Sequence, residues 1–298
     1  MNSSSHDEGG HPRGEILTPT GERIAIPEDI EAAPRHRERS GWNPMGSPAT
    51  YALTALNIGV FVAMVVHGVS PSSPQSIDLV RWGANLGWAD YAAPLVKDAH
   101  GMVIGGFFHG QWWRLVTATF VHVGALHLAT NMWCLWNLGL LGEPLLGPWG
   151  LAATYLLTGV AGNLLSTAVH PEIIGAGASG AVFGLAGILI VLLSNKRLPI
   201  PWPELKKLRR SVIQFALLNL VIGLATSVHD FGVHIDNMAH IGGFLCGLVL
   251  GVPLLPRMTA GRVRYLSRQK AVFVGGALVL ALAGYWLASL TAGMVTNS

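Results

Sequence analysis

The sequence predicts an all-α protein, a polytopic membrane helical bundle of seven transmembrane helices, from its composition and its apolar stretches. Hydrophobic residues make up 51% of the 298 residues and charged residues only 12%, against about 25% charged residues in ordinary soluble domains. A transmembrane helix needs about 20 mostly apolar residues, and several stretches approach that length. They cover residues 50–67, 126–142, 149–169, 178–194, 212–228, 238–255 and 271–292. The alternation typical of β-barrel strands does not occur between them, so we expect helices.

The positions of the basic residues predict the orientation of these helices. Of the 19 Lys and Arg residues, five precede the first span, six lie between the fourth and fifth, and five lie between the sixth and seventh. Seven spans place these three segments on one side of the membrane and leave only Arg81, Lys97 and Arg114 on the other. Because basic residues concentrate in cytoplasmic loops, we expect the N-terminus in the cytoplasm and the C-terminus outside.

The chain divides into three regions by composition. Residues 1–48 carry mixed charges, Pro and Gly without the hydrophobic core of a secretory signal, so we expect a disordered cytoplasmic tail that the mature protein keeps. Residues 49–255 hold the first six spans, and residues 256–298 hold a basic cytoplasmic loop and the seventh.

The outer loop 68–125, between the first two spans, is long and rich in Trp, Phe and aliphatic residues. A loop of this length is functional or disordered as a rule, and its apolar content argues against disorder. Its tryptophans, which suit a membrane interface, are Trp82, Trp88, Trp112 and Trp113. We therefore expect a structured element that lies partly in the outer leaflet.

Composition also excludes several kinds of site. The two cysteines, Cys134 and Cys246, both lie in apolar runs, which excludes a disulfide framework and a cysteine-based metal site. We expect no cofactor and no metal. The net charge of +3 is explained by the basic cytoplasmic segments, so we expect the lipid bilayer and not nucleic acid as a partner.

Polar side chains inside the spans are the candidates for function, because they are costly in a membrane. His127 and Asn131 open the second span, Ser179 opens the fourth in GAGASGAVFGLAG, and His240 opens the sixth. Under the expected topology these three spans run from outside to inside. The four side chains therefore share one depth, just below the outer surface.

The same residues match the requirements of serine hydrolysis. Helix 178–194 carries Gly180, Gly184 and Gly187, and helix 238–255 carries glycines four residues apart at Gly243, Gly247 and Gly251. Two helices that meet along such small faces can approach closely, which would bring Ser179 near His240 as nucleophile and general base. The start of a helix also offers free N–H groups to an oxyanion, and His127 and Asn131 would add donors.

Each residue also has a structural interpretation. A serine in a glycine-rich span is most often a packing residue, and His127 and Asn131 could cross-link helices by hydrogen bonds. The coincidence of polar groups at one depth in three helices favours catalysis over these alternatives. The remaining histidines of interest, in or near the outer loops, are expected to face water or headgroups: His122, His170, His229 and His234.

The sequence resembles the rhomboid intramembrane serine proteases over about residues 50–255. The resemblance rests on the following residues, in this order along the chain: Trp113-Arg114 in the outer loop, His127-x-x-x-Asn131, Gly177-Ala178-Ser179-Gly180, and Ala239-His240 followed by Gly243 and Gly247. It implies a rhomboid fold with a six-helix catalytic core at 49–255 and one additional helix. It also implies intramembrane proteolysis by a serine hydrolase, with transmembrane proteins as substrates.

The resemblance implies a role for each matching residue. Ser179 would be the nucleophile and His240 the general base, in a dyad without an aspartate. The Ser179 N–H, with the side chains of His127 and Asn131, would form the oxyanion hole. Gly177, Trp113 and Arg114 would support the site. Phe183 stands where many members carry a tyrosine against the catalytic imidazole, and Asp236 would face the outer loop.

Other functions remain open from the sequence. A catalytically inactive rhomboid relative that binds or escorts membrane proteins is the main alternative, although such relatives usually lack the serine or the histidine. A transporter would place its polar sites near the midplane, within an inverted repeat that is not apparent here. The His-Glu-x-x-His helix of a zinc protease does not occur, and neither does the pair of intramembrane acidic residues of an aspartyl protease. The absence of targeting sequences suggests a bacterial inner membrane.

Overall fold

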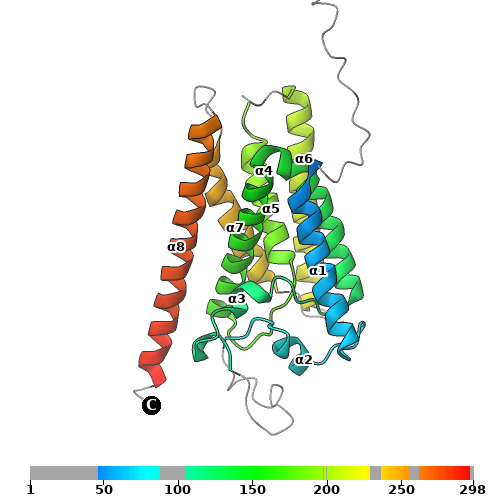
Figure 1. The fold of residues 1–298 in the computed structure, drawn as a ribbon, viewed down its shortest axis with the longest axis vertical. Helices are drawn as coiled ribbons and strands as arrows, with labels where there is room; N and C mark the ends of the chain where they lie inside the picture. Colours follow the sequence, from blue (N-terminus) through cyan, green and yellow to red (C-terminus); the bar gives the residue numbers. More distant parts are fainter. Residues whose placement is uncertain are drawn as a thin grey trace, which may run out of the picture. The chain divides into compact units, whose positions relative to one another are not determined.

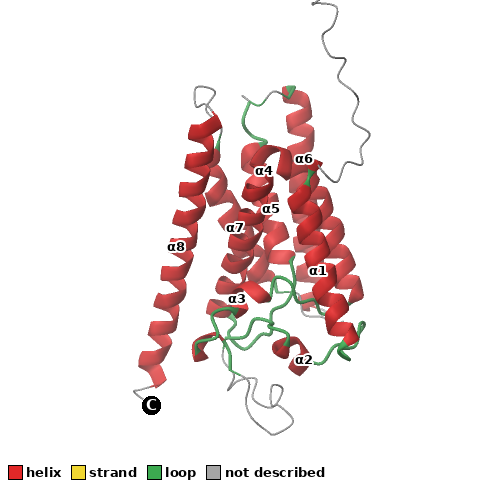
Figure 2. Ribbon diagram, in the orientation of Figure 1, coloured by secondary structure: helices red, strands yellow, loops and turns green. Residues whose placement is uncertain are grey.

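The computed structural model describes residues 46–87, 105–196, 198, 200–228, 236–255 and 262–295. Most of the expected polar tail, Trp88 in the outer loop, and the loop residues His229 and His234 lie outside the described residues. The described part is helical, with loops between the helices (Figures 1 and 2). The helices are α1 (Pro48–Val66), α2 (Ser76–Arg81), the 3-10 turn η3 (Phe107–His109), α3 (Arg114–Thr117), α4 (Ala125–Val169), α5 (Ser179–Leu192), α6 (Trp202–Val228), α7 (Asn237–Leu254) and α8 (Arg262–Val295).

Four helices in the described part are long and apolar enough to cross a membrane: α1, α4, α7 and α8. The all-helical membrane bundle is thereby confirmed, but the count differs from the seven expected spans. The difference arises because the second and third expected spans lie within α4 on either side of a break at Gly147 and are counted together, and because α5 has only 14 residues. The stretch expected at 212–228 begins earlier, with two charged turns at the start of α6.

Helix α4 is broken near its middle. Gly147 has φ +75° and ψ 165°, which is not helical, and Pro148 follows it without a backbone N–H. Carbonyl groups before the break therefore lose partners within the helix. Helix α8 supplies donors to two of them, since Gln269 Nε2 donates to the Leu146 carbonyl at 2.8 Å and the Tyr265 hydroxyl to that of Leu145 at 3.3 Å.

Helix α5 lies against α7 at the distance that only glycine allows. A Cβ atom at Gly243 would collide with the carbonyl oxygen of Gly180, and one at Gly247 with that of Gly184. In the other direction, a Cβ atom at Gly187 would collide with the carbonyl oxygen of Phe244. The expected meeting of two small helix faces is confirmed, and it sets the register of the two helices.

A buried carboxylate joins α4 to α1. Glu143 accepts hydrogen bonds from the backbone N–H groups of Ala49 and Thr50, at 2.9 and 2.8 Å, and from the Thr50 hydroxyl at 2.7 Å. The first N–H groups of a helix lack acceptors within the helix, and its N-terminus favours negative charge. Glu143 therefore has a structural role as a cap for α1.

The outer loop is structured where it is described, as expected. Its α2, η3 and α3 lie at the end of the bundle where α8 finishes, opposite the starts of α6 and α8 (Figure 1). Arg114 is only 2% exposed and donates to the carbonyls of Val80 at 2.6 Å and Ala84 at 3.0 Å. Its guanidinium also lies 4.6 Å from the centre of the Trp113 ring. Arg114 thus connects α3 to the turn after α2.

Candidate active site

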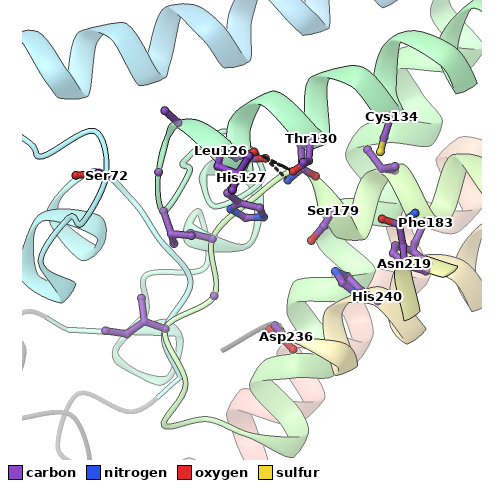
Figure 3. Close-up of a pocket in the computed structure, with 18 of the residues that line it drawn as sticks. Ser72, Leu126, His127, Thr130, Cys134, Ser179, Phe183, Asn219, Asp236 and His240 are labelled. Carbon is purple, nitrogen blue, oxygen red and sulfur yellow. Dashed lines mark hydrogen bonds between the residues drawn. The ribbon is translucent and has the colours of Figure 1, made fainter. Parts of the chain in front are cut away.

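A cavity of about 700 Å³ lies where four helices and the segment before α5 meet (Figure 3). The start of α4 provides one wall, and α5, α6 and α7 provide the others. Most of the lining is apolar, and a few polar side chains converge on the space, a combination typical of ligand sites. The polar lining side chains include His127, Asn131, Ser179, Asn219, Asp236 and His240.

Ser179 is the first residue of α5 and lies on the cavity wall. The chain reaches it through Gly177, whose φ of +134° is one that residues with a side chain rarely adopt. A Cβ atom at Gly177 would also lie 2.6 Å from Cε1 of His127. Glycine is therefore required there, both by the backbone and by the approach of His127.

His240 lies in the first turns of α7, and its ring is almost completely buried. It stacks on Phe183 with ring centres 4.3 Å apart and an angle of 13° between the planes. Figure 3 shows the Ser179 hydroxyl and the His240 ring pointing toward one another across the cavity. The stacking that the resemblance implied for Phe183 is therefore present, and it holds the imidazole in one orientation.

The glycine contact between α5 and α7 explains why Ser179 and His240 face the same cavity. Gly180 follows Ser179 directly, and Gly243 comes three residues after His240. Because the backbones touch at this pair, the serine and the histidine project into the same cavity from adjoining turns. Sliding one helix by a turn would move the pair apart by about 5.4 Å, the pitch of an α-helix.

His127 and Asn131 lie one turn apart near the start of α4 and both line the cavity. Asn131 Nδ2 donates to the carbonyl oxygen of His127 at 2.9 Å, so one of its two amide hydrogens is used within the helix. The other remains for a group in the cavity. Figure 3 shows His127 on the opposite side of Ser179 from His240.

Asp236 does not face the outer loop as expected. It precedes α7 and accepts a hydrogen bond from the Ala239 N–H at 3.0 Å, which caps the helix. Its second oxygen accepts from the Ser166 hydroxyl on α4. Nδ1 of His240 has no hydrogen-bond partner in the described part of the chain, so the aspartate is not bound to the imidazole. Asp236 holds the start of α7 against α4.

His122 was expected to face water or headgroups, but it lies next to the candidate site, in contact with the segment that leads to Ser179. The structure buries it completely, with its ring centre 5.4 Å from that of His127. Nε2 accepts a hydrogen bond from the Ala178 N–H at 3.4 Å, and Nδ1 lies 3.2 Å from the Phe120 carbonyl oxygen. Burial, and to a smaller degree the charge of His127, lowers the pKa of His122 to about 3. His122 is therefore neutral, with Nδ1 as donor and Nε2 as acceptor.

Trp113 and Arg114 lie outside the cavity lining, in the folded outer loop. A backbone bridge connects this loop to the segment before α5. The Asn85 N–H donates to the Gly175 carbonyl at 2.7 Å, and the Gly175 N–H donates to the Asn85 carbonyl at 2.9 Å. The two supporting residues can therefore affect Ser179 only indirectly, through the loop.

Comparison with known proteins shows that the chain is similar in sequence to rhomboid proteins. Residues 109–257 match the family model described as "Rhomboid domain". The rhomboid protease GluP of Bacillus subtilis is 33% identical over 225 residues, which cover 74% of this chain and 38% of the relative. RHOMBOID-like protein 6, mitochondrial, of Arabidopsis thaliana is 34% identical over 265 residues, 78% of this chain and 76% of the relative.

A further relative is the rhomboid protease AarA of Providencia stuartii. It is 29% identical over 223 residues, which cover 68% of this chain and 71% of the relative. The chain thus spans less than half the length of GluP, but most of the length of the other two relatives.

Proposed function

Since the chain belongs to the rhomboid family of intramembrane proteases, we propose that it is a serine endopeptidase that cleaves membrane proteins in or near their transmembrane segments. Ser179 and His240 would form its catalytic dyad. The observation that carries the proposal is the shared cavity, into which the serine projects from the start of α5 opposite an imidazole held by Phe183. We propose no acidic third member of a triad, because Asp236, the carboxylate on the lining, accepts from the Ala239 N–H and the Ser166 hydroxyl instead of from His240.

The proposed reaction follows from the arrangement of these side chains. His240 takes the proton of the Ser179 hydroxyl as Oγ attacks the carbonyl carbon of the scissile peptide bond. The Ser179 N–H and the side chains of His127 and Asn131 donate to the oxyanion that forms. His240 then protonates the leaving amine, and a water molecule, activated by the same imidazole, hydrolyses the acyl-enzyme.

The substrates that suit this cavity are transmembrane helices that can unwind. A helix hides its amide groups in internal hydrogen bonds, so local unwinding must precede attack. The family implies cleavage near the outer ends of such helices, with small residues at the scissile bond. The site's position at the ends of α4, α5 and α7 nearest the outer loop supports this depth.

The topology proposed for the enzyme has seven spans in a six-plus-one arrangement. Helix α4 would cross the membrane twice, with its break at Gly147 between the crossings, and α5 and α6 would complete a core over residues 49–255. The N-terminus would be cytoplasmic and the C-terminus outside, in a bacterial inner membrane. The starts of α6 and α8, near the basic segments, lie at the end of the bundle opposite the outer loop, which supports this orientation (Figure 1).

A covalent probe tests the proposed nucleophile. A fluorophosphonate is expected to label the purified protein once, on the peptide that contains Ser179, as read by mass spectrometry. His240→Ala should prevent labelling because the hydroxyl then lacks its base, while Ser289→Ala on an exposed face of α8 should label normally. A folded wild-type protein that is not labelled would favour the inactive relative that binds membrane proteins.

His122 is proposed as a positioning residue for the oxyanion hole. Its replacement by alanine leaves the Ala178 N–H without an acceptor, and we expect kcat to fall about tenfold, the equivalent of one hydrogen bond of about 1.4 kcal/mol. The KM should change little, since His122 does not line the cavity. Steady-state cleavage of a transmembrane substrate, with thermal unfolding in parallel, measures both effects.

His122→Gln is the matched control for that variant, because its amide oxygen can accept the same N–H. It should recover most of the lost kcat. A glutamine variant as slow as the alanine variant, or an alanine variant with normal kcat, would remove His122 from the mechanism.

A further inference from the structure

A cluster of basic residues surrounds Trp202 at the start of α6, at the end of the bundle opposite α2 and α3 (Figure 1). The Trp202 ring has three cations over it: Lys196 Nζ at 5.1 Å, Lys206 Nζ at 5.5 Å and the Arg209 guanidinium at 5.8 Å from its centre. Such distances are typical of cation–π contacts. The indole therefore lies among three positively charged side chains, two from α6 and one from the turn after α5.

Within the described ranges, these charges have no acidic partner. In the part of the chain that the structure describes, no carboxylate forms an ion pair with Lys196, Lys206, Lys207, Arg209 or Arg210. Like charges held around one ring repel one another, and the repulsion falls when an anion lies between them. A groove of about 500 Å³ opens at this place, lined by Lys206, Lys207, Arg209, Arg210 and Ile213.

The exposed face of α6 changes from basic to aliphatic along its length. Lys206, Lys207 and Arg210 are exposed in its first turns. Leu217, Leu218 and Val221 follow at helical spacing and are 57%, 60% and 60% exposed. Seven residues separate Arg210 from Leu217, about 10 Å along a helix. A cationic head and an apolar stripe on one helix face match the two parts of a phospholipid.

We propose that this face of α6 binds an anionic phospholipid, with the phosphate group between Lys206 and Arg210 and an acyl chain along Leu217, Leu218 and Val221. This site goes beyond the proposed proteolysis and does not depend on it. The same helix carries Phe215 and Asn219 into the wall of the cavity that holds Ser179. A lipid bound at this face would therefore contact the same helix, α6, whose other side chains line that cavity.

Native mass spectrometry of the full chain in detergent tests the site with dioleoyl phosphatidylglycerol as the probe. The double variant Lys206→Gln/Arg210→Gln is expected to bind this lipid at least tenfold more weakly than the wild type. The matched control is Arg264→Gln/Lys270→Gln, which removes one Lys and one Arg from exposed positions of α8 and should bind normally. Thermal unfolding establishes that both variants are folded.

Three outcomes would overturn the proposal. Equal losses in the two double variants would mean diffuse attraction between the basic surface and the lipid. Equal binding of the zwitterionic dioleoyl phosphatidylcholine by the wild type would mean that the net negative charge of the lipid is not recognised as proposed. Displacement of the lipid by the soluble headgroup glycerophosphoglycerol at similar concentration would mean that the aliphatic stripe holds no acyl chain.

Discussion

Ser179→Ala is expected to abolish the release of cleaved membrane-protein fragments, with a fall in kcat of roughly a thousandfold or more. The reason is that the Ser179 hydroxyl points toward His240 in the cavity (Figure 3). The hydroxyl of Thr130, also on the lining, instead donates to the backbone carbonyls of Leu126 and His127. Proteomics of fragments released from membranes with the wild type and with the variant measures the effect and identifies substrates at the same time.

His240→Ala should produce a loss of the same order, because serine and base act as one unit. Ser289→Ala is the control for an exposed hydroxyl that serves only its own helix. Folding is checked by thermal unfolding, since neither side chain bears on the glycine contact between α5 and α7. Fragment release that persists in purified, folded Ser179→Ala would contradict the proposed nucleophile.

Gly243→Ala is expected to destabilise the bundle by about 1–3 kcal/mol, the usual cost of overpacking a well-packed core. The added methyl group would meet the backbone carbonyl of Gly180, which cannot rotate away as a side chain can. The helices α5 and α7 would have to separate, and Ser179 and His240 would separate with them. Both the unfolding temperature and the cleavage rate should therefore fall.

Gly275→Ala on α8 is the matched control, because no described atom outside its own stretch of helix lies within 4 Å of the place its Cβ would occupy. It should leave stability unchanged or raise it slightly, as alanine favours helix over glycine. Unfolding of both variants in the same detergent compares them directly. A Gly243→Ala protein as stable as Gly275→Ala would contradict the close backbone contact between Gly243 of α7 and Gly180 of α5.

Much of the fold could be predicted from the sequence, because a segment that crosses a membrane must be apolar over most of its length. Only long apolar helices satisfy their backbone groups in lipid, so the apolar stretches predicted α1 and α7 closely. They also predicted the apolar part of α8, a helix that begins nine residues before the expected 271. Small residues are typical of close helix contacts in membranes. The pairing of α5 with α7 was therefore predicted from Gly180, Gly184, Gly243 and Gly247. The spacing of His127 and Asn131 predicted one shared face.

Other features depended on contacts between distant segments. The two apolar stretches between 126 and 169 predicted two helical segments, and α4 contains them on either side of its break at Gly147. The donors from α8 that stabilise this break lie more than a hundred residues later and could not be predicted. Arg114 was expected to support the site, and its actual partners are carbonyls about thirty residues earlier. The sequence around Arg114 could not identify these partners, because every residue of the chain has a backbone carbonyl.

The sequence by itself determined the helical membrane class, the family and the candidate polar residues, because these depend on composition, spacing and short motifs. Only the tertiary structure decided the environment of each polar group. His122 lies in a segment with loop-like composition and is nevertheless buried, in contact with the Ala178 N–H next to Ser179. Asp236 was expected to face the outer loop, but it caps α7 and accepts a hydrogen bond from Ser166. Burial and hydrogen-bond partners are properties of the packed bundle, since they arise only when segments far apart in the chain are brought into contact.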